Sequence, residues 1–483
     1  MKLLRCDVCV VGSGIAGISA ALAAREAGAC VVLVSLGTLG SGASFSGTTW
    51  GLGMVGPLSD STEDKEAFVQ GILAPAGDVA TSGMAEVLAN RFYESLTTFE
   101  RWGAVLEPAE KGQETHRSYV PCFDTETRGW FGFHAGPSHD PLVNTVLRSG
   151  VECFSAAQAL SLLKDPDTGA LSGLVASCEG ELMAVVCPCV VLATGGMAAL
   201  RKPTLSSGQC RGVGASMAAD VGAQVANLEF EQLMVGIKTS GTPAVFNEKL
   251  WRYTRLEKDG KDVFRLAGID EQEAKAALEA HSWHGPYTSQ RPSRKVEEAI
   301  WAVGGSCDAI IKRPEGELPS FIATYMDWLQ EAHGLGFGDK LPVAVYHQAS
   351  NGGIVIDPKT CQTQVEGLYA AGECAPLFAI DRLGGIASSQ AMVFGQLAGI
   401  EGAAYAKRRP LAPEVPTDQL QLVSCPDEQA ATPKDLKSLD APQLKCKFEQ
   451  WRAYHQAHGE ALLKACIQRR IVSGKEPGPI LCP

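Results

Sequence analysis

The sequence predicts an α/β fold: a parallel sheet, an inserted α+β capping domain and a small C-terminal helical element. Three observations predict it. First, residues 7–34 read as an apolar strand, a glycine-rich turn, a helical run and a second apolar strand. Second, two further apolar strands with small-residue turns follow at 190–196 and 367–373. Third, a long segment at 231–338 interrupts this pattern. Strands that alternate with helices along a chain are typical of a parallel sheet.

Composition limits the possible partners and locations. The chain has 483 residues, a net charge of −12 and a pI near 5.3, which argues against a nucleic-acid groove or an anionic membrane surface. The first apolar run is too short to span a bilayer and no small-residue cleavage site follows it, so we expect neither anchor nor signal peptide. Sixteen scattered cysteines suit reduced thiols, and we predict a cytoplasmic protein.

Two pairs of cysteines lie close enough in the sequence to be candidate metal ligands. Cys6 and Cys9 lie three apart on a predicted strand, which points their side chains to opposite faces. Cys187 and Cys189 flank Pro188, but no histidine follows them at ligand spacing. Since structural metal sites need grouped ligands, no metal site is predicted.

The N-terminal turn is a dinucleotide-binding motif. In Gly12-Ser13-Gly14-Ile15-Ala16-Gly17 the first glycine permits the tight turn, the second admits the pyrophosphate and the third lets helix and strand pack closely. The helix start then holds the pyrophosphate. Ser35 stands at the end of the second strand, where an acid usually binds the ribose, and it does not choose between NAD and FAD. The predicted cofactor residues here are Gly12, Ser13, Gly14, Ala16, Gly17 and Ser35.

Three later segments indicate FAD. They are "VVLATGG" at Val190–Gly196, "GLYAAGE" at Gly367–Glu373 and "DRLGGIASSQAMVFGQLAG" at Asp381–Gly399. With the N-terminal motif, they resemble the fumarate reductase, succinate dehydrogenase flavoprotein and L-aspartate oxidase family over most of residues 5–405. The resemblance implies an FAD-dependent oxidoreductase built on a Rossmann-type domain.

The resemblance also implies where FAD lies. Glu373 is expected on the ribitol or ribose hydroxyls, and the helix start near Gly385 is expected to face flavin N1 and O2, where reduced flavin carries negative charge. Residues 150–175 read as a strand, a helix-like "AQALSLL" and a hairpin signal "DPDTG", and bring Ala157 to the adenine. The cofactor residues of these segments are Ala157, Ala193, Thr194, Gly195, Gly372, Glu373, Gly385, Ala387 and Ser388.

The stretch from Gly40 to Gly53 bears on flavin attachment. Family members that tether FAD covalently use a histidine here, and this chain has none. Its small residues, among them Gly42, Ala43 and Ser44, can wrap the isoalloxazine closely. FAD is therefore predicted to be non-covalent.

The chain divides into four expected parts. Residues 1–230 and 339–410 are the two parts of the FAD-binding domain, and 231–338 is the capping domain that closes over substrate. Residues 411–483 comprise a linker, rich in Pro, Asp, Thr and Ser over 411–436, and a helical element over 437–472.

The substrate site departs from the family pattern. Arg382 in "DRLGG" matches the family's "NRLGG" and is the strongest candidate for binding a carboxylate. Met234 replaces the first family histidine, and Gln348 the second, with His347 beside it. A methionine and a glutamine cannot supply the positive charge that a dicarboxylate needs.

The proton-delivering arginine is not identified uniquely. Counting back from "KDGKDVF" points to Lys249, with Arg252 and Arg255 close by. Arg291 and Arg294 are expected to be solvated helix charges.

Three functions remain open. The first is an enoate-type reductase or dehydrogenase that moves a hydride between flavin N5 and a carbon beside a carboxylate, with fumarate itself disfavoured. The second is an amino-acid oxidase similar to L-aspartate oxidase. The third is an electron-transfer flavoprotein subunit that works with an external donor or acceptor protein.

Overall fold

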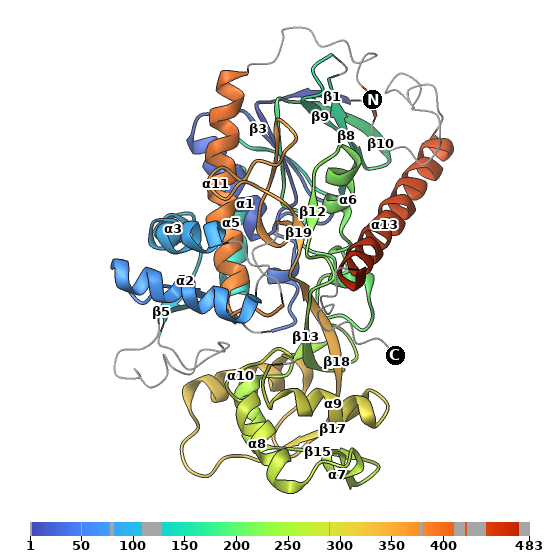
Figure 1. Cartoon of the computed structure of the whole chain (residues 1–483). Coiled ribbons are helices and arrows are strands. Elements are labelled where there is room, and N and C mark those ends of the chain that lie inside the picture. The colour runs from blue at the N-terminus through green and yellow to red at the C-terminus, as the bar shows by residue number, and fades with distance from the viewer. Residues whose placement is uncertain are drawn as a thin grey trace.

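The computed structural model describes residues 2–49, 51–77, 82–108, 128–165, 167–288, 290–375, 380–409, 421–422 and 441–472. Figure 1 shows a larger body with the N-terminus, a smaller body beneath it and a long C-terminal helix along one side. The linker expected at 411–436 lies outside the described residues except for 421–422.

A five-stranded parallel sheet forms the centre of the larger body. Its order is β20-β11-β2-β3-β7, and every neighbouring pair is parallel. Val10, on the middle strand, pairs with Leu33 on one side and Val191 on the other. The α/β prediction is confirmed. The strands are β2 (Val8–Val11), β3 (Val31–Val34), β7 (Glu152–Phe154), β11 (Cys189–Leu192) and β20 (Leu368–Ala370).

Two helices cover this sheet and pack closely on each other. They are α1 (Ile15–Glu26) and α11 (Ile386–Arg408), which lie side by side (Figure 1). A Cβ at Gly399 would lie 2.3 Å from the carbonyl oxygen of Ala20, so only glycine allows this approach.

A second five-stranded sheet has its three central strands between β7 and β11 in the sequence, and one segment of it differs from the prediction. Residues 157–164, expected to be helix-like, form a strand. The apolar run is short and buried, and it pairs with the strand beyond the predicted hairpin, which outweighs the helix propensity of its Ala and Leu residues. The sheet order is β1 (Lys2–Arg5), β10 (Glu181–Val186), β9 (Leu171–Cys178), β8 (Ala157–Lys164) and β21 (Gln421–Leu422).

Smaller elements complete the larger body. A three-stranded sheet packs near the helices α2 and α3, and a two-stranded ladder joins residues near 225 and 353. The elements are β4 (Leu52–Gly56), β5 (Leu106–Pro108), β6 (Gly129–Phe133), α2 (Thr62–Ala76), α3 (Ser82–Arg101), α5 (Ala135–Arg148), α6 (Val213–Asp220), β12 (Val225–Ala226) and β19 (Gly353–Ile354).

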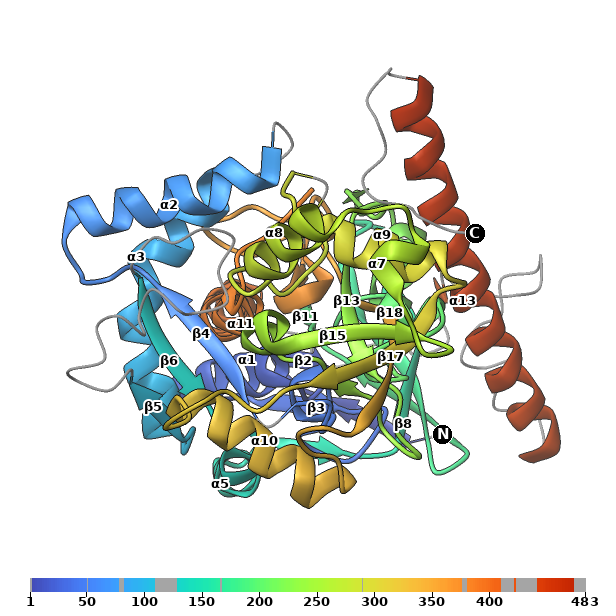
Figure 2. The same ribbon diagram turned by 90° about the horizontal axis from the view of Figure 1, so that it is seen from below.

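The smaller body has its own sheet and its own core. Its six strands include β13 (Glu231–Ile237), β15 (Thr254–Lys258), β17 (Ser306–Ile311) and β18 (Lys340–Ser350), and all these pairings are antiparallel. Figure 2 shows its helices around this sheet. The remaining elements are β14 (Ala244–Val245), β16 (Lys261–Asp262), α7 (Val263–Leu266), α8 (Glu271–His281), α9 (Arg294–Ala302) and α10 (Ser320–His333).

Strand β18 lies wholly beyond the expected boundary at residue 338, in the part assigned to the FAD-binding domain, yet it belongs to the sheet of the smaller body. It pairs with β13 and β17 of the smaller body, and its last residues lead toward the parallel sheet. The division of the chain into domains remains a proposal, and β13 and β18 together connect the two bodies (Figure 1).

The C-terminal helix α13 (Ala441–Val472) packs on α6 and on β8 and β10. The His455 Nδ1 atom lies 2.8 Å from Ser216 Oγ, and the Tyr454 hydroxyl donates to Asp220 at 2.9 Å. No helix in the described ranges has the length and apolar character needed to cross a membrane.

Candidate functional site

The N-terminal turn has the backbone geometry that its motif predicts. Gly12 has φ +106°, and a Cβ there would lie 2.2 Å from the Ala193 carbonyl oxygen. A Cβ on Gly17 would lie 1.8 Å from the Gly12 oxygen, so helix α1 can approach the strand only with glycine. Gly14 caps α1 without any side-chain bond to the first helical N–H groups. These N–H groups are donors for an anion.

The stretch after β3 closes over this turn. Gly42 lies against Gly14, since a Cβ on Gly42 would be 3.1 Å from the Gly14 Cα. Residues 43–45, which include Ala43 and Ser44, form a short 3₁₀ turn after it. This close approach leaves a backbone-lined cradle at the helix start.

Ser35 is engaged by its own neighbours. Its hydroxyl lies 2.6 Å from the Ser13 hydroxyl, and its backbone oxygen accepts from the Ala157 N–H at 2.8 Å. Ala157 therefore lies directly at the end of β3. That is the edge where the resemblance places the adenosine end of FAD.

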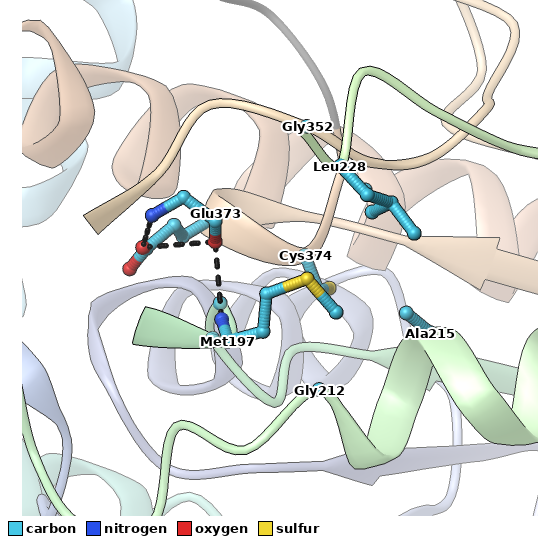
Figure 3. Close-up of a pocket in the computed structure, with 11 residues that line it drawn as sticks. Met197, Gly212, Ala215, Leu228, Gly352, Glu373 and Cys374 are labelled. Carbon is cyan, nitrogen blue, oxygen red and sulfur yellow. Dashed lines mark hydrogen bonds between the residues drawn. The ribbon is translucent and has the colours of Figure 1, made fainter. Parts of the chain in front are cut away.

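The "ATGG" and "GLYAAGE" segments meet across neighbouring strands. The Glu373 carboxylate accepts from the Ser350 N–H at 2.8 Å, and it also accepts from the backbone of Gly196. Burial raises the pKa of Glu373, while the charge of Arg382 and these hydrogen bonds lower it. Figure 3 shows Glu373 and Cys374 facing Met197 and Ala215 across a small pocket. The pocket is lined by Gly195, Gly196, Met197, Gly212, Ala215, Leu228, Ser350, Gly352, Gly353, Glu373 and Cys374.

Helix α11 begins beside the Gly40–Gly53 stretch. Gly385 caps it in the left-handed region at φ +78°, again without a side-chain capping bond, and Ala387 and Ser388 follow in the first turn. A Cβ on Gly385 would lie 3.0 Å from the Gly53 oxygen. The free helix start can stabilise negative charge on a bound group.

Taken together, these features fit a dinucleotide such as FAD. Two helix starts without side-chain caps and several glycines whose positions exclude a Cβ lie at the ends of parallel strands. The assignment of each residue to a part of FAD remains a prediction.

Arg382 is a buried cation. It is 8% exposed, and burial lowers its pKa to about 10 while the charge of Glu373 raises it. The neighbouring Asp381 accepts a hydrogen bond from the Thr288 hydroxyl at 2.7 Å. A guanidinium this buried is a costly feature, which suits a site that receives an anion.

His347 and Gln348 lie where the pairing of β18 with β13 is irregular, and their side chains contact different residues of β13. His347 Nδ1 lies 2.8 Å from Glu231, which also accepts from Arg201 at 3.1 Å, so this histidine belongs to a charged cluster. Gln348 instead accepts from the Gln232 side chain at 3.0 Å. The sequence left both residues open as substrate ligands, and the structure separates them.

Met234 contributes an apolar surface. It clusters with Leu205 and Tyr346, which come from the loop after β11 and from β18. Nothing about Met234 alone identifies these neighbours, since they lie far from it in the sequence.

The three candidate proton donors lie in different environments. Lys249 is buried, its ammonium donates to the Ser282 carbonyl oxygen at 3.1 Å and lies 5.1 Å from the centre of the Trp283 ring. Arg252 pairs with Glu279 at 3.5 Å. Arg255 pairs with Glu257 at 2.9 Å and its side chain is 63% exposed. The structure thus brings only Lys249 and Arg252 to one aromatic ring.

Sequence reasoning passed over several buried acids and bases. Burial raises the pKa of Glu248. The side chains of Glu248 and Met234 both lie against Gly285, 3.3 Å and 3.0 Å from the position that a Cβ would take there. His281 and Glu297 form a fully buried pair at 2.6 Å. In the sequence, the only sign that Glu297 is buried is its position on the apolar face of an amphipathic helix, one turn after the exposed Arg294.

Arg294 lies on α9 and is exposed, as expected for a solvated helix charge, whereas Arg291 precedes that helix and its charge lowers the pKa of Asp381.

The cysteine pairs meet in the core. Cys6 precedes β2 rather than lying on it with Cys9, so the expectation of opposite faces was wrong, and both thiols hydrogen-bond the Cys187 thiol. Burial raises the pKa of Cys187 well above its usual value, which disfavours the nucleophilic thiolate form. Within the described ranges, no group of three or more His, Cys, Asp or Glu residues is arranged to hold a metal ion.

The parallel sheet and its glycine turns define a class, the dinucleotide-binding oxidoreductases. Comparison with known proteins narrows the class to proteins that bind FAD. Residues 7–243 match the family described as FAD binding domain. The chain is 25% identical over 418 residues to the L-aspartate oxidase of Streptomyces coelicolor, covering 81% of this chain and 67% of that protein. It is 23% identical over 423 residues to the fumarate reductase flavoprotein subunit of Escherichia coli, covering 83% and 68%.

The fold has close counterparts among solved structures. The FrdA chain of E. coli quinol fumarate reductase superposes with a TM-score of 0.66 at 20% identity, covering 86% of this chain and 72% of that one. Residues 7–243 therefore carry the FAD binding domain, and the chain is an FAD-dependent oxidoreductase, a distant homologue of fumarate reductase flavoprotein subunits and of L-aspartate oxidases.

Proposed function

We propose that this chain oxidises or reduces a carbon beside a carboxylate, as an enoate-type reductase or dehydrogenase. The observation that carries the proposal is Arg382, a buried guanidinium in the turn that opens α11, with its charge coupled to Glu373 of the cofactor segment. Bound FAD would supply the acceptor or donor of the hydride.

The residues of the chain would do the rest. Arg382 would bind the substrate carboxylate through two parallel N–H bonds, which fixes the direction of the substrate carbon chain. The FAD would be held by the Gly12–Gly17 turn, Gly42, Glu373 and the start of α11. The buried acids and bases of the smaller body, Lys249 and Glu248 among them, would move the proton.

The substrate is proposed to be a monocarboxylate or a bulkier apolar acid. The family histidine positions hold Met234 and Gln348, and Met234 clusters with Leu205 and Tyr346. Neutral side chains cannot balance the second charge of fumarate or succinate. Fumarate turnover at a rate similar to that with the best monocarboxylate would contradict this assignment.

The FAD is proposed to be held without a covalent bond. The support is the Gly40–Gly53 stretch, which has no histidine to attach flavin. Acid precipitation of the purified protein should leave the yellow colour in the supernatant, and a yellow pellet would reject the proposal.

An amino-acid oxidase is the second candidate, favoured by the similarity to L-aspartate oxidases. One experiment separates the candidates. The protein is photoreduced without oxygen and then mixed with either air-saturated buffer or anaerobic solutions of unsaturated monocarboxylates. Flavin reoxidation within seconds by a monocarboxylate, with slow reaction in air, supports the reductase. Fast reoxidation in air and none by the acids supports the oxidase.

Reoxidation by neither would favour the third candidate, a subunit that passes electrons to a partner protein. In that case, a small electron-carrier protein should copurify with the chain.

A further inference from the structure

One of the contacts between the two bodies of the protein is a buried hydrogen bond. The Thr288 hydroxyl donates to Asp381 Oδ2 at 2.7 Å, across 93 residues of sequence. Thr288 is 0% exposed and Asp381 5% exposed. Close by, the Gln290 side chain donates to the Pro75 carbonyl oxygen at 3.3 Å, near the end of α2. The segment that carries Thr288 and Gln290 therefore joins the smaller body to the cofactor-binding body at two places.

On the capping side, Thr288 is held in register with β13. The Tyr287 N–H donates to the Leu233 oxygen at 2.9 Å, and Pro286 forms an isolated bridge with Met234. Because β13 carries Met234, any shift at Thr288 is transmitted to the strand that faces the proposed substrate.

On the cofactor side, the position of Asp381 is set by the contacts of the preceding residue, Ile380. The Ile380 N–H donates to the Ala76 oxygen at 3.3 Å, and Ile380 packs with Ala76 and Phe230. Arg382 follows Asp381 directly in the chain. Asp381 thus lies between the capping segment and the proposed carboxylate ligand.

The residue type at 381 matters because the pattern that this segment resembles, "NRLGG", has an asparagine there. An asparagine accepts the same hydrogen bond from Thr288 but cannot ionise. Asp381 is therefore a titratable group at a hydrogen bond with Thr288 that the neutral amide of an asparagine could also accept.

We propose that Thr288 and Asp381 form the latch that holds the capping body over Arg382, and that Asp381 is a positioning residue whose ionisation opens this latch. The inference rests on the proposed function for the role of Arg382, but the latch itself is defined by the contact between the two bodies.

The sign of the pH effect follows from the surroundings of Asp381. Burial raises its pKa to about 7, while the Thr288 hydroxyl and the charge of Arg291 lower it. Tyr287, whose own pKa is raised by burial and by nearby acids including Asp381, and Arg382 are the other titratable groups here. In an open latch, a solvated Asp381 would return to a pKa of about 3.9. The closed latch therefore binds a proton that the open one releases, and closure weakens as the pH rises toward about 7.

Hydrogen exchange of the holoprotein tests the latch without knowledge of the substrate. The readout is the protection factor of the backbone amides of Gly285, Tyr287 and Thr288 (Pro286 has no N–H), with the amides of β2 as internal reference. Thr288→Val keeps the shape but loses the hydroxyl, which donates to Asp381 and accepts from the Gln290 N–H at 3.1 Å, and protection should fall at least tenfold. In Thr288→Ser, which keeps the hydroxyl, it should stay near that of the wild type. The matched control is Thr254→Val, since the buried Thr254 donates to the Leu250 oxygen away from the latch. Equal protection in Thr288→Val and wild type would overturn the proposal.

The pH profile supplies an arm that does not depend on the Thr288 variants folding. Between about pH 5 and pH 7, wild-type protection at 285–288 should fall by up to about tenfold per pH unit relative to β2, and level off above that. In Asp381→Asn the profile should be flat. A wild-type profile as flat as that of Asp381→Asn would refute the latch, whereas failure of every carboxylate to react would refute only the proposed function.

Discussion

Gly12→Ala should remove FAD from this protein, because the methyl group meets backbone atoms that cannot move aside. The new Cβ would lie 2.2 Å from the Ala193 oxygen and 2.8 Å from its carbonyl carbon, on the chain that leaves β11. The residue also has φ +106°, which L side chains rarely adopt. The left-handed conformation costs about 1–2 kcal/mol. The overpacking adds about 1–3 kcal/mol.

The turn relieves this strain only by changing the shape that faces the pyrophosphate. If the whole cost of about 2–5 kcal/mol appears in binding, FAD affinity falls between about 30-fold and several thousand-fold. Gly28→Ala is the matched control. Gly28 has φ +88°, but its Cβ would meet only the Lys407 ammonium at 4.0 Å, so it shares the strain without the clash. It should lose about 1–2 kcal/mol of stability and keep its flavin.

The assay is the ratio of flavin absorbance near 450 nm to protein absorbance, measured after dialysis and again with added FAD. Thermal unfolding shows whether each variant is folded. A folded Gly12→Ala variant with full flavin content would refute the reasoning, as would equal loss of flavin in both variants.

Other predictions concern the substrate site and stability. Arg382→Met should weaken the binding of a substrate carboxylate by about 10- to 100-fold, from the loss of charge-assisted hydrogen bonds, and the ligand-induced change in flavin absorbance measures it. Arg382→Lys should retain only part of the wild-type affinity for the carboxylate. Full affinity in Arg382→Met would exclude Arg382 as the residue that binds the substrate carboxylate. Glu297→Gln should cost about 3–5 kcal/mol of unfolding free energy in denaturant titrations, because it breaks a pair that is fully buried with His281. Burial lowers the pKa of His281, but the charge of Glu297 and the hydrogen bond to it together raise that pKa by more, so the net shift is upward. The pair therefore stabilises the fold fully below about pH 6.5, the pKa of His281 in the unfolded chain, and this stabilisation is lost as the pH rises through the higher pKa of His281 in the folded protein. The difference in unfolding free energy between wild type and Glu297→Gln should shrink over that range, and a difference that stays constant with pH would argue against this pair.

The cofactor-binding half of the fold could be predicted because its signals are local. The strand, turn and helix at residues 8–26 depend on neighbours within a few residues, and glycines mark the places where backbones must touch. Residues 157–164 show the limit of such signals. This short, mostly apolar run suits a helix or a buried strand equally, and only pairing with 171–178 decides for the strand.

The substrate site could be predicted only in part, since its contacts join distant segments. Arg382 could be proposed from the sequence because it lies within a motif. Glu231 and His347 are 116 residues apart and meet only because β13 pairs with β18. The register of that pair shifts between Gln232 and Leu233, and no local pattern in either strand reveals where such a shift falls.

That shift has a consequence for the choice between His347 and Gln348. Neighbouring residues on a strand face opposite sides, so moving the register by one residue exchanges which of them faces Gln232. In this structure Gln348 does, and His347 is held by Glu231 on the other side together with Arg201. A buried acid beside a histidine and an arginine is costly unless all three stay together, which favours this register over its alternative. The amide face that results is neutral, and Arg382 is left as the strongest candidate among the sequence-predicted residues for receiving a carboxylate.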